Sequence, residues 1–275
     1  MSEAQAIANT PEPRTRTSLT ADLRRLGVAP GMTLLVHSSL RSLGWVCGGP
    51  VTVIQALLDL LTPAGTLVMP AHSGDYSDPA DWSNPPVPPE WQPEIRDTMP
   101  LFEPRYTPTR GMGAIAEAFR SWPDSRRSHH PQVSFAAWGQ AADFVTANHS
   151  IANCLGEGSP LARVYELDGQ VLLLGVGHDC NTSFHLAEYR AQVRAQLLNG
   201  MPLLVDGRRQ WHTAPDINLN DDPFPQIGAD FEQTGAVTLG PVGSASTRLF
   251  SQRAAVDFAR QWLVNSKQWS VISEK

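Results

Sequence analysis

The sequence has few cysteines and no long apolar run, and both deficits narrow the classes of protein it can be. Its 275 residues include only Cys47, Cys154 and Cys180, which are too few and too scattered for a disulfide framework and form no Cys-x-x-Cys pair. No stretch reaches the roughly 18 consecutive apolar residues that span a bilayer, and the N-terminal residues lack the apolar core of a signal peptide. We therefore expect a cytoplasmic protein with no membrane partner.

Basic residues are fewer than acidic ones, which bears on the partners of this chain. Lys and Arg number 21 against 27 Asp and Glu, a formal net charge of −6 at pH 7. Non-specific binding to nucleic acid needs a basic stripe, so we expect no nucleic-acid partner. The charge suits a cationic small molecule instead.

Internal repeats, low-complexity tracts and the glycine fingerprints of P-loop and dinucleotide-binding proteins are also missing. What is present is a hydrophobic content of 41%, enough for a large core in one compact α/β unit with an extension. We expect a flexible N-terminus at 1–17, a single domain at 18–268 and a tail at 269–275. A long loop rich in proline and tryptophan, at 72–108, interrupts the domain, and we interpret it as either a lid over a site or a passive surface excursion.

Apolar strand-like runs alternate with helical patterns along this domain. Strands are expected at 33–36, 66–70, 133–138 and 170–176. Helices are expected at 18–27, 50–61, 111–121, 140–147, 160–166, from 181 or 182 onward, and from 242 to 264. The first strand, helix and second strand form a βαβ unit with a right-handed crossover. The fold class is therefore α/β, with a central mixed, largely parallel sheet flanked by helices.

The C-terminal part is more β-like. Segments 202–205 and 209–213 flank Asp206-Gly207-Arg208, and Asp-Gly supplies the positive φ of a tight hairpin turn. Five carboxylates follow in a segment without strong periodicity: Asp216, Asp221, Asp222, Asp230 and Glu232. We expect a β-hairpin and then an irregular acidic loop, which either binds a cationic ligand or is simply solvated.

The most informative segment runs from Gly175 to Arg190, directly after the apolar strand at 170–176. That strand ends in glycines, the pattern of a buried strand that stops at a sheet edge. His178, Asp179, Asn181 and Thr182 then form a polar turn that can cap the following helix. Ligand sites in open α/β sheets are usually found at this position, so we expect the active site here.

His185 and Glu188 are three residues apart and share one face of the helix that begins in this turn. A carboxylate that accepts one ring N–H fixes the imidazole tautomer and leaves the other nitrogen free to take a proton. The positive end of the helix dipole disfavours the imidazolium while Glu188 favours it, a balance that suits a neutral, basic histidine. The alternative is a half-buried histidine paired with a glutamate on an ordinary amphipathic helix.

A second strand end carries polar groups of the same kind, because Thr33-Leu34-Leu35-Val36 is followed by His37-Ser38-Ser39. Taken together, six segments resemble the aminoglycoside 3-N-acetyltransferase family over most of the chain. They are Val36–Arg41, Gly65–Pro70, Thr109–Gly113, His130–Gly139, Ser159–Val164 and Gly175–Glu188. The long loop at 72–108 resembles the longer-looped branch of that family.

The resemblance implies an antibiotic N-acetyltransferase fold and an enzyme that uses acetyl-CoA, without a metal, to acetylate the 3-amino group of an aminoglycoside, with a role in antibiotic resistance. It assigns His185, Glu188 and Asp179 to catalysis, and Asp221 and Asp222 to the acceptor. Residues implied to bind the cofactor are His37, Ser38, Ser39, Leu40, Arg110, Gly111, Met112, Gly113 and Thr182. A glycine-rich helix start after Arg110 can also receive a diphosphate through free N–H groups.

The expected mechanism is direct transfer in a ternary complex, with His185 as general base and Glu188 holding it. Asp179 supports the turn or fixes the acceptor, and the turn from Asn181 to Ser183 supplies an oxyanion donor. A route through an acetyl-cysteine on Cys180 stays open, because this thiol lies in the same turn.

Three other interpretations stay open. The acceptor could be another amine. A zinc hydrolase could use His178, Asp179 and His185, although their spacing is not a standard ligand motif. A ligand-binding protein could keep the fold without the chemistry, which the intact His185 and Glu188 argue against. The loop at 72–108 could also mediate a homodimer.

Overall fold

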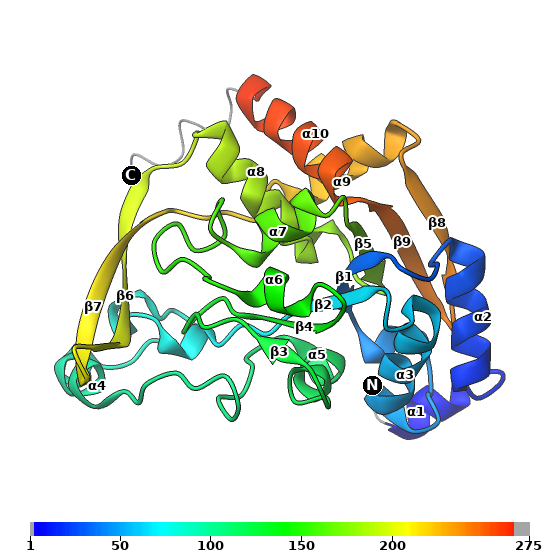
Figure 1. The fold of residues 1–275 in the computed structure, drawn as a ribbon, viewed down its shortest axis with the longest axis horizontal. Helices are drawn as coiled ribbons and strands as arrows, with labels where there is room; N and C mark the ends of the chain where they lie inside the picture. The colour runs from blue at the N-terminus through cyan, green and yellow to red at the C-terminus, as the bar shows by residue number, and fades with distance from the viewer. Residues whose placement is uncertain (1–2, 267–275) are drawn as a thin grey trace.

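The apolar run Thr33–Ser38 forms strand β1 at the centre of a seven-stranded sheet (Figure 1). This computed structural model describes residues 3–266. The strand order across the sheet is β3-β4-β2-β1-β5-β9-β8. The other strands of this sheet are β2 (Thr66–Pro70), β3 (Arg126–Arg127), β4 (Phe135–Gly139), β5 (Gln170–Leu174), β8 (Val237–Val242) and β9 (Ala245–Ser251). The expected mixed α/β sheet is confirmed.

The parallel part of the sheet is smaller than expected. Only β2, β1 and β5 are parallel to one another, whereas β3, β4, β9 and β8 join the sheet through antiparallel pairs. The expectation of a largely parallel sheet is therefore wrong outside the centre. Hairpin and edge strands need no helical crossover, so they add antiparallel pairs on both sides of the βαβ core.

Alternating side chains of the central strands supply two separate cores. Leu34 and Val36 pack on one face with helices α2 (Arg16–Leu26), α3 (Gly49–Leu61) and α5 (Gly113–Arg120). Leu35 packs on the opposite face, because successive side chains of a strand point to opposite sides. The helices on that face are α6 (Ala142–Thr146), α7 (Pro160–Glu166), α8 (Ser183–Ala191), α9 (Phe224–Gln233) and α10 (Gln252–Asn265).

Part of the N-terminal segment at 1–17 has regular secondary structure. Helix α1 (Glu3–Ala8) forms there, and Arg14 bridges to Val46. Helix α2 begins at Arg16, before the expected position, because the side chain of Thr15 accepts a hydrogen bond from the backbone N–H of Ser18. The expected tail at 269–275 lies outside the described residues. None of the helices between residues 3 and 266 is long and apolar enough to cross a membrane.

The expected hairpin is confirmed and is longer than its sequence pattern. Strands β6 (Gln196–Val205) and β7 (Arg208–Ile217) are joined by Asp206 and Gly207, both at positive φ. The hairpin extends away from the sheet and packs against the loop at 72–108 near helix α4 (Gln92–Thr98), at the left of Figure 1. Arg209 donates from Nε to the carbonyl oxygen of Met99 at 2.6 Å.

Two C-terminal expectations are wrong. Residues 242–251 do not begin the closing helix. Val242 ends β8, a turn follows at Gly243, and Ala245–Ser251 form β9, because alternate side chains from Ala245 to Leu249 are buried, the period of a strand. The closing helix α10 starts only at Gln252, capped by Ser251. The acidic segment is not irregular throughout, since Asp230 and Glu232 lie on α9, which buries Phe224, Ile227 and Phe231.

Candidate active site

The carboxyl ends of β1, β2 and β5 meet at one edge of the sheet because these three strands are parallel. Two adjoining cavities open at this edge, an inner one of about 340 Å³ and an outer one of about 640 Å³. Five residues line both, namely Ser38, Gly111, Met112, Val176 and Cys180. The two cavities therefore form one continuous groove.

His185 lines the inner cavity from the first turns of α8. Its Nδ1 lies 2.6 Å from Oε2 of Glu188, so the expected pair forms. Phe224 packs against the imidazole, with ring centroids 4.8 Å apart. The ring is thus held by the carboxylate and by the aromatic ring, which leaves Nε2 as the nitrogen free for chemistry.

Glu188 is completely buried and has two further partners that the sequence did not reveal. Its Oε1 accepts hydrogen bonds from Nε of Arg194 at 2.5 Å and from the backbone N–H of Asn220 at 3.2 Å. Arg194 comes from the segment after α8, and Asn220 from the segment between β7 and α9. No spacing in the sequence predicts these two contacts, because they form only when both segments pack against α8.

Two further histidines line the inner cavity, His37 at the end of β1 and His72 just after β2. Burial lowers the pKa of His37 to about 3, with a smaller effect from His185, and burial likewise lowers the pKa of His72 to about 3. Both rings are therefore neutral at physiological pH. His37 was expected to contact the cofactor, and its Nε2 lies 3.3 Å from the hydroxyl of Thr182, which also lines this cavity.

His72 is a cavity residue that sequence reasoning missed. Its signal was its position at the end of a parallel strand, the same position that drew attention to His37. The sequence pattern alone does not distinguish it from a surface or structural histidine. Within the loop at 72–108, His72 alone lines the inner cavity.

The turn His178–Cys180 contributes Asp179 and Cys180 to the inner cavity. His178 faces the other way, where its Nε2 lies 3.0 Å from Oε1 of Glu232. The structure therefore separates the trio of His178, Asp179 and His185 that a zinc hydrolase would need. Within residues 3–266, no group of three or more His, Cys, Asp and Glu side chains is arranged to hold a metal ion.

The acidic candidates divide in the same way. Asp221 and Asp222 are both exposed, but of the two only Asp221 lines the inner cavity, while the backbone N–H of Asp222 donates to Oδ1 of Asn220 at 2.9 Å. Burial and the nearby carboxylate of Asp179 raise the pKa of the Cys180 thiol to about 11. Cys180 is thus a protonated thiol at neutral pH.

The backbone N–H groups of the turn from Asn181 to Ser183 are already engaged. They donate to the carbonyl oxygens of His178 and Cys180 and to the side-chain oxygen of Asn181. Of the residues in this turn, Thr182 lines the inner cavity, so its hydroxyl can reach a ligand there.

The outer cavity collects most of the remaining cofactor candidates. Ser38, Ser39 and Leu40 line it from the end of β1, and Gly111, Met112 and Gly113 line it from the start of α5. Arg110 is not among its lining residues, since this exposed side chain pairs with Asp75. Helix α1 and Trp45 complete the wall, a contribution that the sequence did not suggest.

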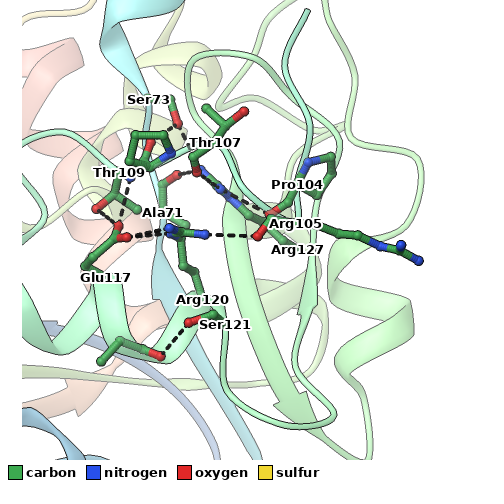
Figure 2. A network of polar contacts seen from close by, with 12 residues as sticks. Ala71, Ser73, Pro104, Arg105, Thr107, Thr109, Glu117, Arg120, Ser121 and Arg127 are labelled. Carbon is green, nitrogen blue, oxygen red and sulfur yellow. Dashed lines mark hydrogen bonds and ion pairs between the residues drawn. The ribbon is translucent and has the colours of Figure 1, made fainter.

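A polar network fixes the loop that leads into α5 (Figure 2). Glu117 accepts hydrogen bonds from the backbone N–H and hydroxyl of Thr109 at 2.8 and 2.7 Å and from Arg120 at 2.8 and 2.5 Å. Arg127 donates to the carbonyl oxygens of Ala71 and Thr107 at 2.6 and 2.5 Å. The network thus ties the end of β2 to the segment that lines both cavities.

Comparison with known proteins connects this geometry to a family. A model of the family described as aminoglycoside 3-N-acetyltransferase matches residues 35–264. The chain belongs to this family. It is an acyltransferase that acts on an amino group.

Among its relatives, the SPbeta prophage-derived aminoglycoside N(3')-acetyltransferase-like protein YokD of Bacillus subtilis is 48% identical, over 94% of this chain and 96% of YokD. The aminoglycoside N(3)-acetyltransferase III of Pseudomonas aeruginosa is 36% identical, over 91% of this chain and 94% of that enzyme.

Solved structures show the same fold. The crystal structure of YokD gives a TM-score of 0.95 at 46% identity, covering 97% of this chain and 99% of YokD. AAC-IIIb, solved as a binary complex with CoASH, gives a TM-score of 0.81 at 33% identity and covers 92% of this chain and 97% of the AAC-IIIb chain. AAC-VIa, solved with bound sisomicin, gives a TM-score of 0.82 at 32% identity and covers 92% of this chain and 98% of the AAC-VIa chain.

Proposed function

We propose that this acyltransferase moves the acetyl group of acetyl-CoA directly to the 3-amino group of an aminoglycoside, with His185 as general base. The observation that carries the proposal is the 2.6 Å contact between His185 and the buried Glu188 on the wall of the inner cavity. Relatives that bind CoASH and sisomicin support the two substrate classes. A CoA thioester as donor also favours the cytoplasm as its compartment.

The outer cavity is the proposed site of acetyl-CoA. Gly111 and Gly113 adopt positive φ, and a Cβ added to either would meet nothing closer than 3.8 Å, so both glycines present open backbone to the cavity. The N-terminal end of α5 begins at Gly113, where free N–H groups and the helix dipole favour a phosphate. The shared wall at Ser38 and Met112 lets a thioester reach from the outer cavity into the inner one.

In the inner cavity, Nε2 of His185 removes a proton from the acceptor ammonium, and Glu188 stabilises the ring as it gains charge. The freed amine nitrogen then bonds to the thioester carbonyl carbon. Collapse of the addition product breaks the carbon–sulfur bond and releases CoA, whose thiolate takes up the second proton that the nitrogen loses as the amide forms. His185 then releases the first proton to solvent. The hydroxyl of Thr182 is the proposed donor to the developing oxyanion, since the backbone donors of its turn are engaged.

The chemistry of Cys180 supports direct transfer over a covalent route. A thiol whose pKa lies at about 11 is almost entirely protonated at neutral pH, and the thiolate is the reactive nucleophile. The neighbouring Asp179 would also repel the negative charge of a thiolate.

Carboxylates that line the inner cavity support a cationic acceptor. Asp179 and Asp221 face the cavity that contains His185, and ammonium groups of an amino sugar can pair with them. Asp222 has no place on this wall, so its proposed role is limited to the exposed rim beside Asp221.

The test is thiol release from acetyl-CoA with aminoglycosides that carry or lack the 3-amino group, compared between wild type and His185→Gln. We expect turnover only with acceptors that carry this amine, and a loss of at least about 100-fold in the variant, the range of general-base catalysis. Turnover on other amines alone would assign a different acceptor. A His185→Gln enzyme with wild-type kcat would contradict the proposed base.

A further inference from the structure

Arg194 is the one arginine or lysine, among residues 3–266, that contacts either member of the His185–Glu188 pair. Its side chain is only 7% exposed, and the Glu188 side chain is fully buried. Nε of Arg194 binds Oε1 of Glu188, while His185 binds Oε2. The carboxylate is therefore held between a residue that is always charged and a residue that must change charge during the reaction.

A buried carboxylate needs a positive partner, because removing it from water is costly unless it is paired. If His185 were the only partner, the pair would gain most by binding a proton, and the resulting imidazolium could not act as a base. Arg194 supplies a permanent positive charge on the opposite oxygen. Glu188 can then stay ionised while His185 is neutral, which is the state that accepts a proton.

The other titratable groups around the pair do not supply this charge. His37 and His72 face the same cavity from β1 and from the end of β2, and burial keeps both rings neutral. Asp179 and Asp221 face it from the other walls, and as carboxylates they cannot supply a positive charge. On the far side of Glu188, a separate cavity is lined by Glu157, Tyr189 and Arg194 itself. Tyr189 there donates to Asp216.

Arg194 makes a second contact that reaches the acceptor wall. Its Nη2 donates to the carbonyl oxygen of Asn220 at 3.1 Å, and the N–H of Asn220 donates to Glu188. Asn220 directly precedes Asp221, which lines the inner cavity. One guanidinium therefore joins the carboxylate of the pair to the segment that carries a proposed acceptor ligand.

We propose that Arg194 is a positioning residue that keeps Glu188 ionised beside a neutral His185 and aligns the Asn220–Asp221 segment with this pair. The inference rests on the proposed general-base role of His185. Neither task requires Arg194 to touch a substrate, and its two contacts can be separated by substitution.

The charge is tested with Arg194→Met in the acetyl-CoA and sisomicin assay. Loss of a cation in contact with the carboxylate should move the acid limb of the kcat/KM profile upward by about one pH unit or more, with about a tenfold loss on that limb. Arg190→Met is the matched control, since Arg190 lies on α8 with His185 and Glu188 but pairs with the exposed Glu157. Its acid limb should stay in place. An unshifted limb in an active Arg194→Met enzyme would overturn the inference.

The alignment is tested with Arg194→Lys, which keeps the charge and loses the planar fork. We expect the wild-type acid limb and a KM for sisomicin raised about threefold or more, the loss of roughly one hydrogen bond. A wild-type KM for sisomicin would overturn the proposed alignment of the Asn220–Asp221 segment by Arg194. If Arg194→Met does not fold, removal of the buried charge by Glu188→Gln in the same chain should restore folding, and failure to restore it would contradict the charge argument.

Failure of the proposed function would look different from failure of this inference. In that case the wild-type protein acetylates no amine, whatever residue stands at 194. The NMR titration of the His185 ring, assigned with His185→Gln, would still compare wild type with Arg194→Met. A midpoint that does not rise in the variant overturns the inference without reference to activity.

Discussion

The position and the pKa of the Cys180 thiol bear on whether the acetyl group passes directly to the acceptor or through an acetyl-cysteine. The thiol lines both cavities, so its position alone would permit an acetyl-cysteine. Its raised pKa, caused by burial and by Asp179, opposes that route. Position and reactivity are separate properties, and only the second depends on the surrounding charges.

Cys180→Ala should therefore keep kcat within about twofold of wild type, because no bond to sulfur forms on the direct route. Initial rates with acetyl-CoA and an aminoglycoside measure this. Cys47→Ala, which changes an exposed thiol, is the control. A burst of acylated protein in wild type that disappears in Cys180→Ala would instead establish the covalent route.

At the scale of elements, the His178 side chain of the turn His178–Cys180 packs directly on the backbone of helix α9 at Gly228. A Cβ on Gly228 would lie 2.0 Å from Cγ of His178. The same turn carries Asp179 and Cys180 into the inner cavity. A larger side chain at position 228 must therefore displace Asp179 and Cys180 as well as the helix.

Gly228→Ala should lower the free energy of unfolding by about 1–3 kcal/mol, the usual cost of overpacking, even though alanine favours helices. Thermal denaturation measures the loss. Gly74→Ala is the control, since a Cβ there meets nothing within 4 Å. Equal melting temperatures for both variants would show that the His178 side chain moves aside freely.

The segment before α5 is held in place by hydrogen bonds from Thr109 to Glu117 (Figure 2). Burial alone would raise the pKa of this carboxyl, but hydrogen bonds from Arg120 and Thr109 outweigh it and lower the pKa to about 2. A lowered pKa in the folded state means that the network stabilises the protein fully above about pH 4.5 and loses this contribution as the pH falls toward 2.

Glu117→Gln should raise the KM for acetyl-CoA about fivefold, the equivalent of roughly 1 kcal/mol of lost positioning, with little change in kcat. Glu166→Gln is a matched control because Glu166 also pairs with an arginine at helical spacing, Arg163, away from both cavities. Steady-state kinetics with varied acetyl-CoA decide the matter. An unchanged KM would mean that Thr109 keeps its place without the carboxylate.

For the molecule as a whole, buried histidines make stability depend on pH. Burial lowers the pKa of His37, His72 and His130 to about 3 and that of His149 to about 4, below the ordinary value of 6.5. Unfolding lets these rings bind protons as the pH falls below 6.5. The free energy of unfolding therefore falls as the pH drops below 6.5, whereas above this value the rings are neutral in both states and cause no loss.

The free energy of unfolding should fall by several kcal/mol between pH 7 and pH 5, with an upper limit of about 2 kcal/mol for each buried histidine. Carboxyl groups titrate mostly below this window. Urea denaturation at pH 7, 6 and 5 measures the slope. His130→Asn should reduce it by about a quarter, because three other histidines are buried in the same way, whereas exposed His212→Asn should not. Equal stability at pH 7 and pH 5 would contradict the burial argument.

Local patterns in the sequence were enough for the elements whose periodicity is strong. The βαβ start, the strand at 170–174 and the Asp206-Gly207 turn follow from apolar runs and turn chemistry. The His185–Glu188 pair also follows, because two residues three apart on a helix must share a face. These predictions depend on neighbours in the chain and need no knowledge of the rest of the fold.

Other features depend on contacts between distant segments, and only the tertiary structure decided them. The antiparallel flanks of the sheet, strand β9 and helix α9 each take their form from packing against another element. Arg194 reaches Glu188, and His178 turns to Glu232, across segments that no spacing relates. The sequence by itself thus determined the chemistry available at the site, and tertiary packing decided which groups are buried, paired and charged there.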